Sequence, residues 1–321
     1  MINIPHIDRV IWNAEYKTIE IISELQRTKR AEISVDGEGS DLTELGLYRL
    51  LDSICEQFKF AKSAITIHTH NQLETHSEYK IVRKPPLYIV DGQNFAKSTV
   101  LPNKTIKKHF GIFINRSSWQ RLLLASYLYK NYSDKLCLTY RYNSASDYHK
   151  HHLSFDQLSH QLGLSNALEL TSDLLKKMPI EHDQLDVVPI PVPTTFGLTS
   201  VYKDFFAEIV CETFCYGQSF YPTEKTWRPL VCKTPFMVQG PCNFLKNLRS
   251  LGFKTFGQWW DESYDEDGGT VAIATIQRNI DMLAKLTPAQ LQDLYTEMQP
   301  TLEHNYNVFM SLSDKEFTQW K

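Results

Sequence analysis

The alternation of strand-like and helix-like segments in the first half of the chain constrains its fold most. Residues 31–35 (AEISV) have the alternating, β-branched pattern of a strand, and residues 63–71 (SAITIHTHN) have it again. Between them, residues 42–58 place apolar side chains at helical spacing, with Ser40 or Asp41 as the expected N-cap. A strand, a helix and a strand in this order are typical of a parallel sheet, so we expect an α/β fold.

The rest of the chain continues this alternation. We expect further strands at residues 86–93 (PLYIVDGQ), 110–115 (FGIFIN), 135–142 (KLCLTYRY) and 234–240 (TPFMVQG). We expect further helices at residues 117–132, at 241–253 and over the tail from residue 287. Residues 201–214 (VYKDFFAEIVCETF) fit either a helix or a strand, and we favour a helix followed by a short strand. Residues 98–109 have the polar, lysine-rich composition of a linker.

A chain of 321 residues is long for one domain and comfortable for two. The pattern predicts two Rossmann-like α/β domains with helices closing the chain. We place an N-terminal domain at residues 1–107, a second α/β domain at residues 108–300 and a helical tail at residues 301–321.

The composition argues against several classes of protein. The 42% of hydrophobic residues can form sizeable cores, and the net charge of -3 argues against a histone-like binder but leaves room for a local basic groove. The six cysteines form no CxxC pair, which favours reduced thiols over a zinc site or a disulfide framework. No apolar run approaches the roughly 20 residues that span a bilayer. We therefore expect a cytoplasmic protein without a membrane anchor.

Two carboxylates follow the strand expected at residues 31–35, in the sequence SVDGEGSDL. Asp36 and Glu38 lie where a parallel sheet presents its ligands, and Gly37 and Gly39 permit a tight turn there. A carboxylate at this edge could take a proton from an attacking hydroxyl group. The same residues could instead form an acidic helix start, which the helix dipole favours.

A second group of polar residues follows the strand at 110–115. Asn115 and Arg116 lie at its carboxyl end, and Arg121 falls in the first turns of the next helix. A helix N-terminus offers N–H donors to a phosphate and an arginine offers a forked pair, so this stretch suits phosphate binding. A surface arginine is the alternative interpretation.

Histidines occur in two groups, ITIHTHNQLETH and DYHKHH. Strand alternation would put His68 and His70 on one face. No carboxylates accompany the histidines at a spacing typical of metal ligands, so we expect no metal site.

Three stretches in the second half resemble, in order and approximate spacing, the donor-binding motifs of the fucosyltransferase-like glycosyltransferases. They are Asn115 with Arg121 five residues further on, an aromatic-rich segment ending in Glu212-Thr213, and Tyr221 followed by Thr223-Glu224-Lys225, a helix and PFMVQG. The resemblance covers roughly residues 108–260, about half of the chain. Two departures are that Thr213 stands where the family has Asn, and that the segment before Tyr221 is about two residues longer.

The resemblance implies a GT-B-like fold, in which two Rossmann-like domains face a central cleft. It also implies an inverting reaction that needs no metal and no cofactor beyond the nucleotide-sugar co-substrate. Lys225 and Arg121 would bind the diphosphate, and Glu224 would accept hydrogen bonds from the ribose hydroxyls. The same donor site would include Tyr221, packed near the donor, with Thr223 and Asn115. The family's base lies in the N-terminal domain, where Glu38 is the first candidate by position and Asp36 the second.

These observations leave the acceptor open. The expected partners are a nucleotide-sugar donor and a hydroxyl acceptor, either a glycan or a hydroxymethylated base in phage DNA. Residues 80–88 (KIVRKPPLY), with Lys97, Lys104, Lys107 and Lys108, could contact DNA phosphates or form a solvated linker. The alternatives are a non-catalytic nucleic-acid- or partner-binding protein on the same fold and a nucleotide hydrolase, which would need a metal site.

Overall fold

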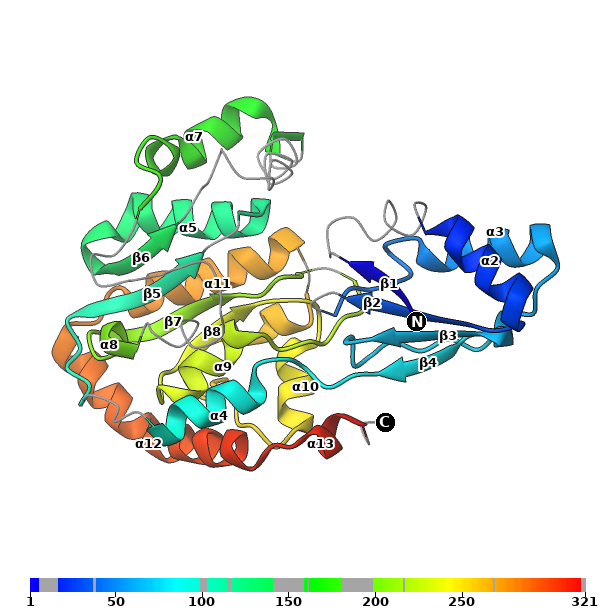
Figure 1. The fold of residues 1–321 in the computed structure, drawn as a ribbon. Coiled ribbons are helices and arrows are strands. Elements are labelled where there is room, and N and C mark those ends of the chain that lie inside the picture. Colours follow the sequence, from blue (N-terminus) through cyan, green and yellow to red (C-terminus); the bar gives the residue numbers. More distant parts are fainter. Residues whose placement is uncertain are drawn as a thin grey trace. The chain divides into compact units, whose positions relative to one another are not determined.

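The computed structural model of the chain describes residues 1–5, 17–36, 39–98, 103–114, 117–140, 159–160, 162–180, 199–215, 217–267 and 269–318 (Figure 1). The chain forms two compact units. Unit 1 comprises Met1–Leu87, Tyr216–Thr223 and Leu312–Lys321, and unit 2 comprises Tyr88–Cys215 and Glu224–Ser311. The expected boundary near residue 107 lies inside unit 2, and a short segment of the second half belongs to unit 1.

Unit 1 contains a four-stranded sheet in which every neighbouring pair is parallel. Its strands follow in chain order: β1 (Ile2–Pro5), β2 (Ala31–Asp36), β3 (Ile65–Thr69) and β4 (Lys80–Arg83). Two helices precede β2 and β3, namely α2 (Thr18–Thr28) and α3 (Leu47–Phe58). Ile33, Ile67 and Leu51 belong to one buried apolar cluster between these elements, so alternating strands and an amphipathic helix form a single core.

Unit 2 contains a second parallel sheet, in the order β6-β5-β7-β8. Its strands are β5 (Lys108–Ile114), β6 (Leu136–Tyr140), β7 (Phe205–Cys211) and β8 (Phe236–Gln239). The chain therefore runs from β5 outward to β6 and then returns to the other side of β5 to form β7. This reversal makes the carboxyl ends of β5 and β7 the place where open α/β sheets bind ligands.

Helices cover both faces of this sheet, as Figure 1 shows. On one face, α5 (Trp119–Tyr132) packs against α11 (Gly269–Leu283), and α7 (Leu164–Leu175) packs on α5. On the other face, α9 (Glu224–Val231) packs against α4 (Ile89–Ser98) and the long α12 (Pro288–Ser311). Short helices described in unit 2 are α8 (Thr199–Tyr202) and α10 (Phe244–Ser250), and α13 (Asp314–Thr318) belongs to unit 1. Two parallel sheets with crossover helices agree with the expected α/β class and with two Rossmann-like units.

The strand expected at residues 86–93 is wrong, because helix α4 begins at Ile89. Its buried residues are Ile89, Gly92 and Ala96, which follow the three- and four-residue spacing of a helix face. Pro85 and Pro86 precede it, and a helix commonly begins just after such residues.

Residues 201–214 contain a helix end and then a strand, in the order we favoured, but the strand takes most of the segment. Strand β7 occupies Phe205–Cys211 with all seven residues buried, and α8 ends at Tyr202. A parallel strand covered on both faces has a continuous apolar run, which periodicity alone does not distinguish from a buried helix.

The expected N-cap of α3 is wrong as well. The Asp41 side chain caps a turn upstream of the helix, where Oδ1 accepts the backbone N–H groups of Thr43 and Glu44 at 2.9 and 3.1 Å. The helix itself begins at Leu47, and its N-cap is Gly46 in the left-handed region with φ 72°.

Within the described ranges, no helix combines the length and apolar character that crossing a bilayer requires.

Candidate functional site

The candidate site lies at the carboxyl ends of β5 and β7 in unit 2. Helix α5 follows β5, and the hydroxyl of its N-cap Ser118 accepts the N–H of Arg121 at 3.4 Å. This cap starts the helix so that Arg121 falls in its first turn, where the side chain is buried. The sequence-based prediction of Arg121 at a helix start is confirmed.

The Arg121 guanidinium connects the helix that follows β5 to the end of β7, and the strand order reverses between these two strands. Its Nη2 donates to the carbonyl oxygen of Glu212 at 2.8 Å, and Glu212 directly follows β7. The backbone of Glu212 is held in turn by β8, because its N–H donates to the Gln239 carbonyl at 2.9 Å. A buried arginine thus ties the end of one strand to the helix that follows another.

Helix α9 adds a second cation beside the same residues. Lys225 Nζ lies 3.3 Å from the Thr213 hydroxyl and 3.0 Å from Glu224 Oε1. The Thr226 hydroxyl donates to Glu212 Oε1 at 2.5 Å, which docks the first turn of α9 onto the end of β7. Arg121 and Lys225 therefore contact consecutive residues of the chain, Glu212 and Thr213.

The adjacent charges of Glu224 and Lys225 form a partly buried pair, with 17% and 16% of their side chains exposed. Burial by itself would raise the pKa of Glu224, but the charges of Lys225 and Arg228 outweigh burial and hold this pKa below its usual range. Glu224 is consequently an ionised acceptor at neutral pH. Its small exposed area suits hydrogen bonds from the hydroxyl groups of a ligand.

A buried ion pair holds α9 against the sheet. Arg228 Nη2 donates to Glu208 Oε1 at 3.1 Å, and the Tyr202 hydroxyl donates to the other oxygen of the same carboxylate. Burial raises the pKa of Glu208 even though Arg228 lowers it. Because Arg228 lies one turn after Glu224 on α9, this pair fixes the helix that presents Glu224 and Lys225.

Glu208 and Arg228 were not among the residues predicted for the site. The four-residue spacing from Glu224 to Arg228 was the available signal, together with Glu208 in an otherwise apolar run. A charged residue inside a buried strand needs a partner, so its presence in β7 indicates a buried pair.

Two cysteines lie near the end of β7. Burial raises the pKa of Cys211 and of Cys215 to about 12. Both are therefore thiols at neutral pH and are poorly suited to act as nucleophiles.

Tyr221 and Thr223 belong to unit 1, and the boundary between the units falls between Thr223 and Glu224. The Tyr221 hydroxyl accepts the N–H of Leu87 at 3.2 Å, and its ring lies 5.7 Å from that of His70. A Cβ built on Gly39 would lie 2.2 Å from the Tyr221 Cβ. Tyr221 thus packs on the loop that follows β2 in unit 1.

Hydrogen bonds hold the whole segment around Tyr221 in unit 1. Asn71, just beyond β3, accepts the Phe220 N–H at 3.0 Å and donates to the Gln218 carbonyl at 2.8 Å. Asp41 Oδ2 accepts the Gln218 N–H at 2.6 Å. Residues 217–223 therefore line the carboxyl edge of the unit 1 sheet, where β2 and β3 end.

The proposed bases are only partly covered by the structure. Asp36 is the last residue of β2, and its backbone pairs with Pro5 in β1. The Asp36 side chain, Glu38 and Asn115 lie outside the described part of the chain. The loop that carries Glu38 continues into Gly39, so it runs directly to the residue against which Tyr221 packs.

The acidic stretch WWDESYDEDGG (residues 259–269) has a structural role. Asp265 accepts the N–H groups of Leu245 and Lys246 at 2.6 and 2.9 Å, which caps the start of α10. Glu262 accepts the N–H of Phe256 at 2.6 Å and the Thr255 hydroxyl at 2.7 Å. These carboxylates are committed to backbone and side-chain donors of unit 2.

Among the described residues, no group of three or more His, Cys, Asp or Glu side chains is placed to hold one metal ion. Comparisons of the chain with models of protein families, with curated proteins and with solved structures found no match.

Proposed function

We propose that the chain is an inverting, metal-independent glycosyltransferase that moves a sugar from a nucleotide-sugar donor to a hydroxyl acceptor. The observation that carries this proposal is the meeting of Arg121 and Lys225 on Glu212 and Thr213, at the ligand-binding edge of the unit 2 sheet. The motif order that resembles the fucosyltransferase-like enzymes supports the same donor.

Two fixed cations suit a nucleoside diphosphate leaving group. When the bond from the anomeric carbon to the diphosphate breaks, negative charge grows on the phosphate oxygens, and preorganised cations stabilise it in the transition state. Arg121 and Lys225 would supply this stabilisation in place of a divalent ion. Glu224, held ionised by its neighbours, would accept hydrogen bonds from the ribose hydroxyls.

Unit 1 would supply the base and bind the acceptor. In an inverting transfer the acceptor oxygen attacks the anomeric carbon, the diphosphate leaves with the bonding electrons, and the acceptor proton passes to a carboxylate. Glu38 is the first candidate for that carboxylate and Asp36 the second. The close packing of Tyr221 against Gly39 supports this assignment, because it fixes the backbone next to Glu38 at this edge of unit 1.

The described contacts favour a glycan over DNA as the acceptor. Of the lysines that could contact DNA phosphates, Lys107 pairs with Asp204 at 2.9 Å, and Lys108 and Lys104 donate to acceptors within unit 2. Lysines that already interact with acceptors of the same unit offer less positive charge to a DNA phosphate backbone.

The test is turnover of nucleotide sugars with EDTA present. We expect the wild type to release nucleoside diphosphate from nucleotide sugars of one base, slowly when water is the acceptor. This release should be lost in Lys225→Gln. It should be retained in Lys246→Gln, which changes an exposed lysine of α10. NMR of the product should show the anomeric configuration inverted. Release that requires Mg²⁺, or that survives Lys225→Gln unchanged, contradicts the proposal.

A further inference from the structure

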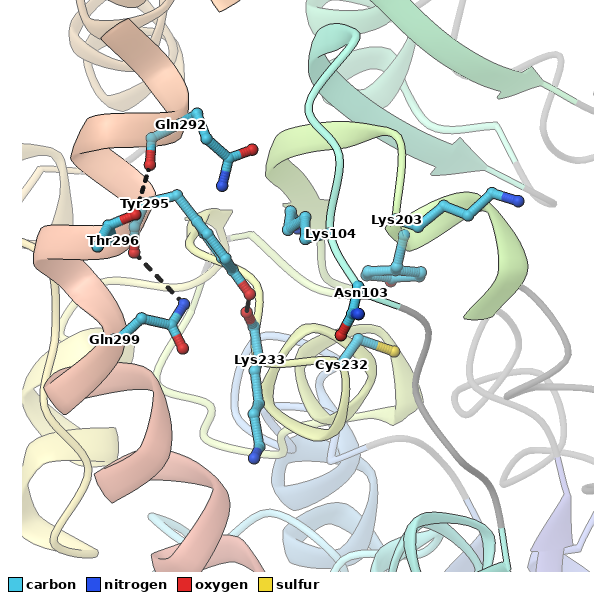
Figure 2. A pocket seen from close by; sticks show the side chains of 10 residues that line it. Asn103, Lys104, Lys203, Cys232, Lys233, Gln292, Tyr295, Thr296 and Gln299 are labelled. Carbon is cyan, nitrogen blue, oxygen red and sulfur yellow. Dashed lines mark hydrogen bonds between the residues drawn. The ribbon is translucent and has the colours of Figure 1, made fainter. Parts of the chain in front are cut away.

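A pocket of about 320 Å³ lies in unit 2, away from the residues of the candidate donor site (Figure 2). Its walls come from the segments that lead into three strands: Lys104 precedes β5, Tyr202 precedes β7, and Cys232 precedes β8. Helix α12 closes it with Tyr295 and neighbouring residues. The pocket therefore opens at the amino edge of the sheet, whereas Arg121 and Lys225 lie at the carboxyl edge.

Lys104 is one of three lysines that line this pocket, with Lys203 and Lys233. Its Nζ donates to the Thr234 hydroxyl at 2.8 Å and lies 5.2 Å from the ring of Phe205 and 5.0 Å from that of Tyr295. Among the described residues it forms no ion pair with a carboxylate. The other lysines differ: Lys233 is bound to Glu303 at 2.7 Å, and Lys203 extends away from the pocket in Figure 2.

The surroundings of Lys104 favour an uncharged amine. Burial lowers the pKa of Lys104 to about 7, against smaller opposing effects of Cys232 and Glu208. Glu208 is already compensated by Arg228 and by the Tyr202 hydroxyl, so it offers Lys104 little as a counter-charge. From α12, Tyr295 faces the amine as a neutral phenol, because burial raises its pKa.

An uncharged lysine amine in a pocket is a nucleophile for carbonyl carbon. We propose that this pocket binds a small aldehyde or ketone, which Lys104 captures reversibly as an imine. Nζ adds to the carbonyl carbon, the carbonyl oxygen leaves as water after taking up two protons from the amine, and a C=N bond replaces C=O.

The walls suit a small polar carbonyl compound. Asn103, Gln292 and Gln299 provide amide groups, and Thr296 provides a hydroxyl, so substituents next to the carbonyl group can be hydrogen-bonded. The volume lies at the lower end of the range of about 300–1,000 Å³ typical of small-molecule sites. The inference is independent of the proposed transferase activity, because it concerns the opposite edge of the sheet.

The experiment is reductive trapping of the full chain with acetaldehyde and cyanoborohydride, followed by peptide mass spectrometry. At pH 7 roughly half of the Lys104 side chains would be neutral, against less than about 0.1% of ordinary lysines, so we expect Lys104 to be labelled about tenfold or more faster than the exposed Lys97. Labelling of Lys104 should level off above about pH 8, while labelling of Lys97 keeps rising.

A pair of variants tests whether the pocket is needed. Thr296 lies on the exposed side of α12 at the pocket wall, so Thr296→Trp should fill the pocket and slow labelling of Lys104 about tenfold, whereas Thr296→Ala should leave it fast. Lys97 serves as the internal reference in every sample. Equal labelling of Lys104 and Lys97 in the wild type, or unchanged labelling of Lys104 in Thr296→Trp, would overturn the proposal.

Discussion

The guanidinium of Arg121 donates to the backbone carbonyl of Glu212 at 2.8 Å, and this bond joins the helix after β5 to the chain that leaves β7. Both residues are buried. The bond is made where the described strands of the unit 2 sheet reverse their order, between β5 and β7. The proposed diphosphate site is therefore tied directly to the topology of the fold.

Replacing Arg121 by lysine should weaken both nucleotide binding and stability. An ammonium group cannot reproduce the planar fork that holds the Glu212 carbonyl and a phosphate together. We expect affinity for the preferred nucleoside diphosphate to fall at least about tenfold, and the free energy of unfolding to fall by about 1–3 kcal/mol. Calorimetric titration and urea unfolding measure the two effects. Arg249→Lys, at an exposed arginine of α10, is the matched control and should change neither by a comparable amount.

Removing the positive partner of the buried pair should be costly. In Arg228→Met the Glu208 carboxylate loses its counter-charge, and we expect a loss of about 3–5 kcal/mol in the free energy of unfolding at pH 7. The pKa of Glu208 is already raised in the folded protein, so its folded form binds a proton more readily than its unfolded form. Without Arg228 this pKa rises further, so the loss should shrink as the pH falls below the higher pKa of the variant and Glu208 takes up a proton. Adding Glu208→Gln should recover part of the loss; a double variant no more stable than Arg228→Met would show that the pair does not account for the effect.

Gly39 should not tolerate a side chain. Its φ is +73°, and an added Cβ would lie 2.2 Å from the Tyr221 Cβ, which cannot move without shifting the segment that carries it. We expect Gly39→Ala to lower the free energy of unfolding by about 3 kcal/mol, combining overpacking with backbone strain. Gly252→Ala is the control, because Gly252 has φ +92° and an added Cβ would approach no atom closer than Val308 at 3.8 Å, an ordinary contact, so it should cost about 1 kcal/mol. Equal losses in urea unfolding would mean that the contact with Tyr221 does not hold.

Replacing Lys104 by methionine should change how stability depends on pH. The folded pKa of about 7 lies below the unfolded value near 10.4, so between these values the unfolded chain binds more protons and wild-type stability rises with pH. Lys104→Met removes this contribution. We expect the variant to be more stable than the wild type below about pH 7, and the difference to shrink as the pH rises toward 10. Urea unfolding at pH 6, 8 and 9.5 measures it, and a difference independent of pH would contradict the assignment.

The sequence predicted the parts of the fold that depend on local patterns. Strands β2, β3, β5, β6 and β8 and helices α3, α5, α10 and α12 were expected in place, because each combines a clear period with turn or cap residues. Most of strand β7 was assigned to a helix, and the start of helix α4 was assigned to a strand. The first is buried on both faces and shows no alternation, and the second is short and follows two prolines.

The candidate site was predicted to a similar extent. Motif order pointed to Arg121, Glu224 and Lys225, and the structure gathers these three at Glu212 and Thr213. No local sequence pattern could reveal that Arg228 pairs with Glu208, because the two side chains come together only when α9 packs on β7. The contact of Tyr221 with Gly39 likewise joins residues from distant parts of the chain, so the assignment of Tyr221 to unit 1 required the structure.

The proposed function depends on the binding of a nucleoside diphosphate at the carboxyl edge of the unit 2 sheet. The most direct measurement is thermal unfolding with UDP, GDP, CDP and ADP, each with Mg²⁺ and with EDTA, on wild type, Lys225→Gln and Lys246→Gln. A ligand at 100 times its dissociation constant stabilises a protein by roughly 2.7 kcal/mol, which shifts the melting temperature measurably. We expect one of the four nucleoside diphosphates to raise the melting temperature of the wild type and of Lys246→Gln equally, with or without Mg²⁺. We expect it to leave the melting temperature of Lys225→Gln unchanged. No shift with any of the four nucleotides, or an equal shift in Lys225→Gln, would contradict the proposed function.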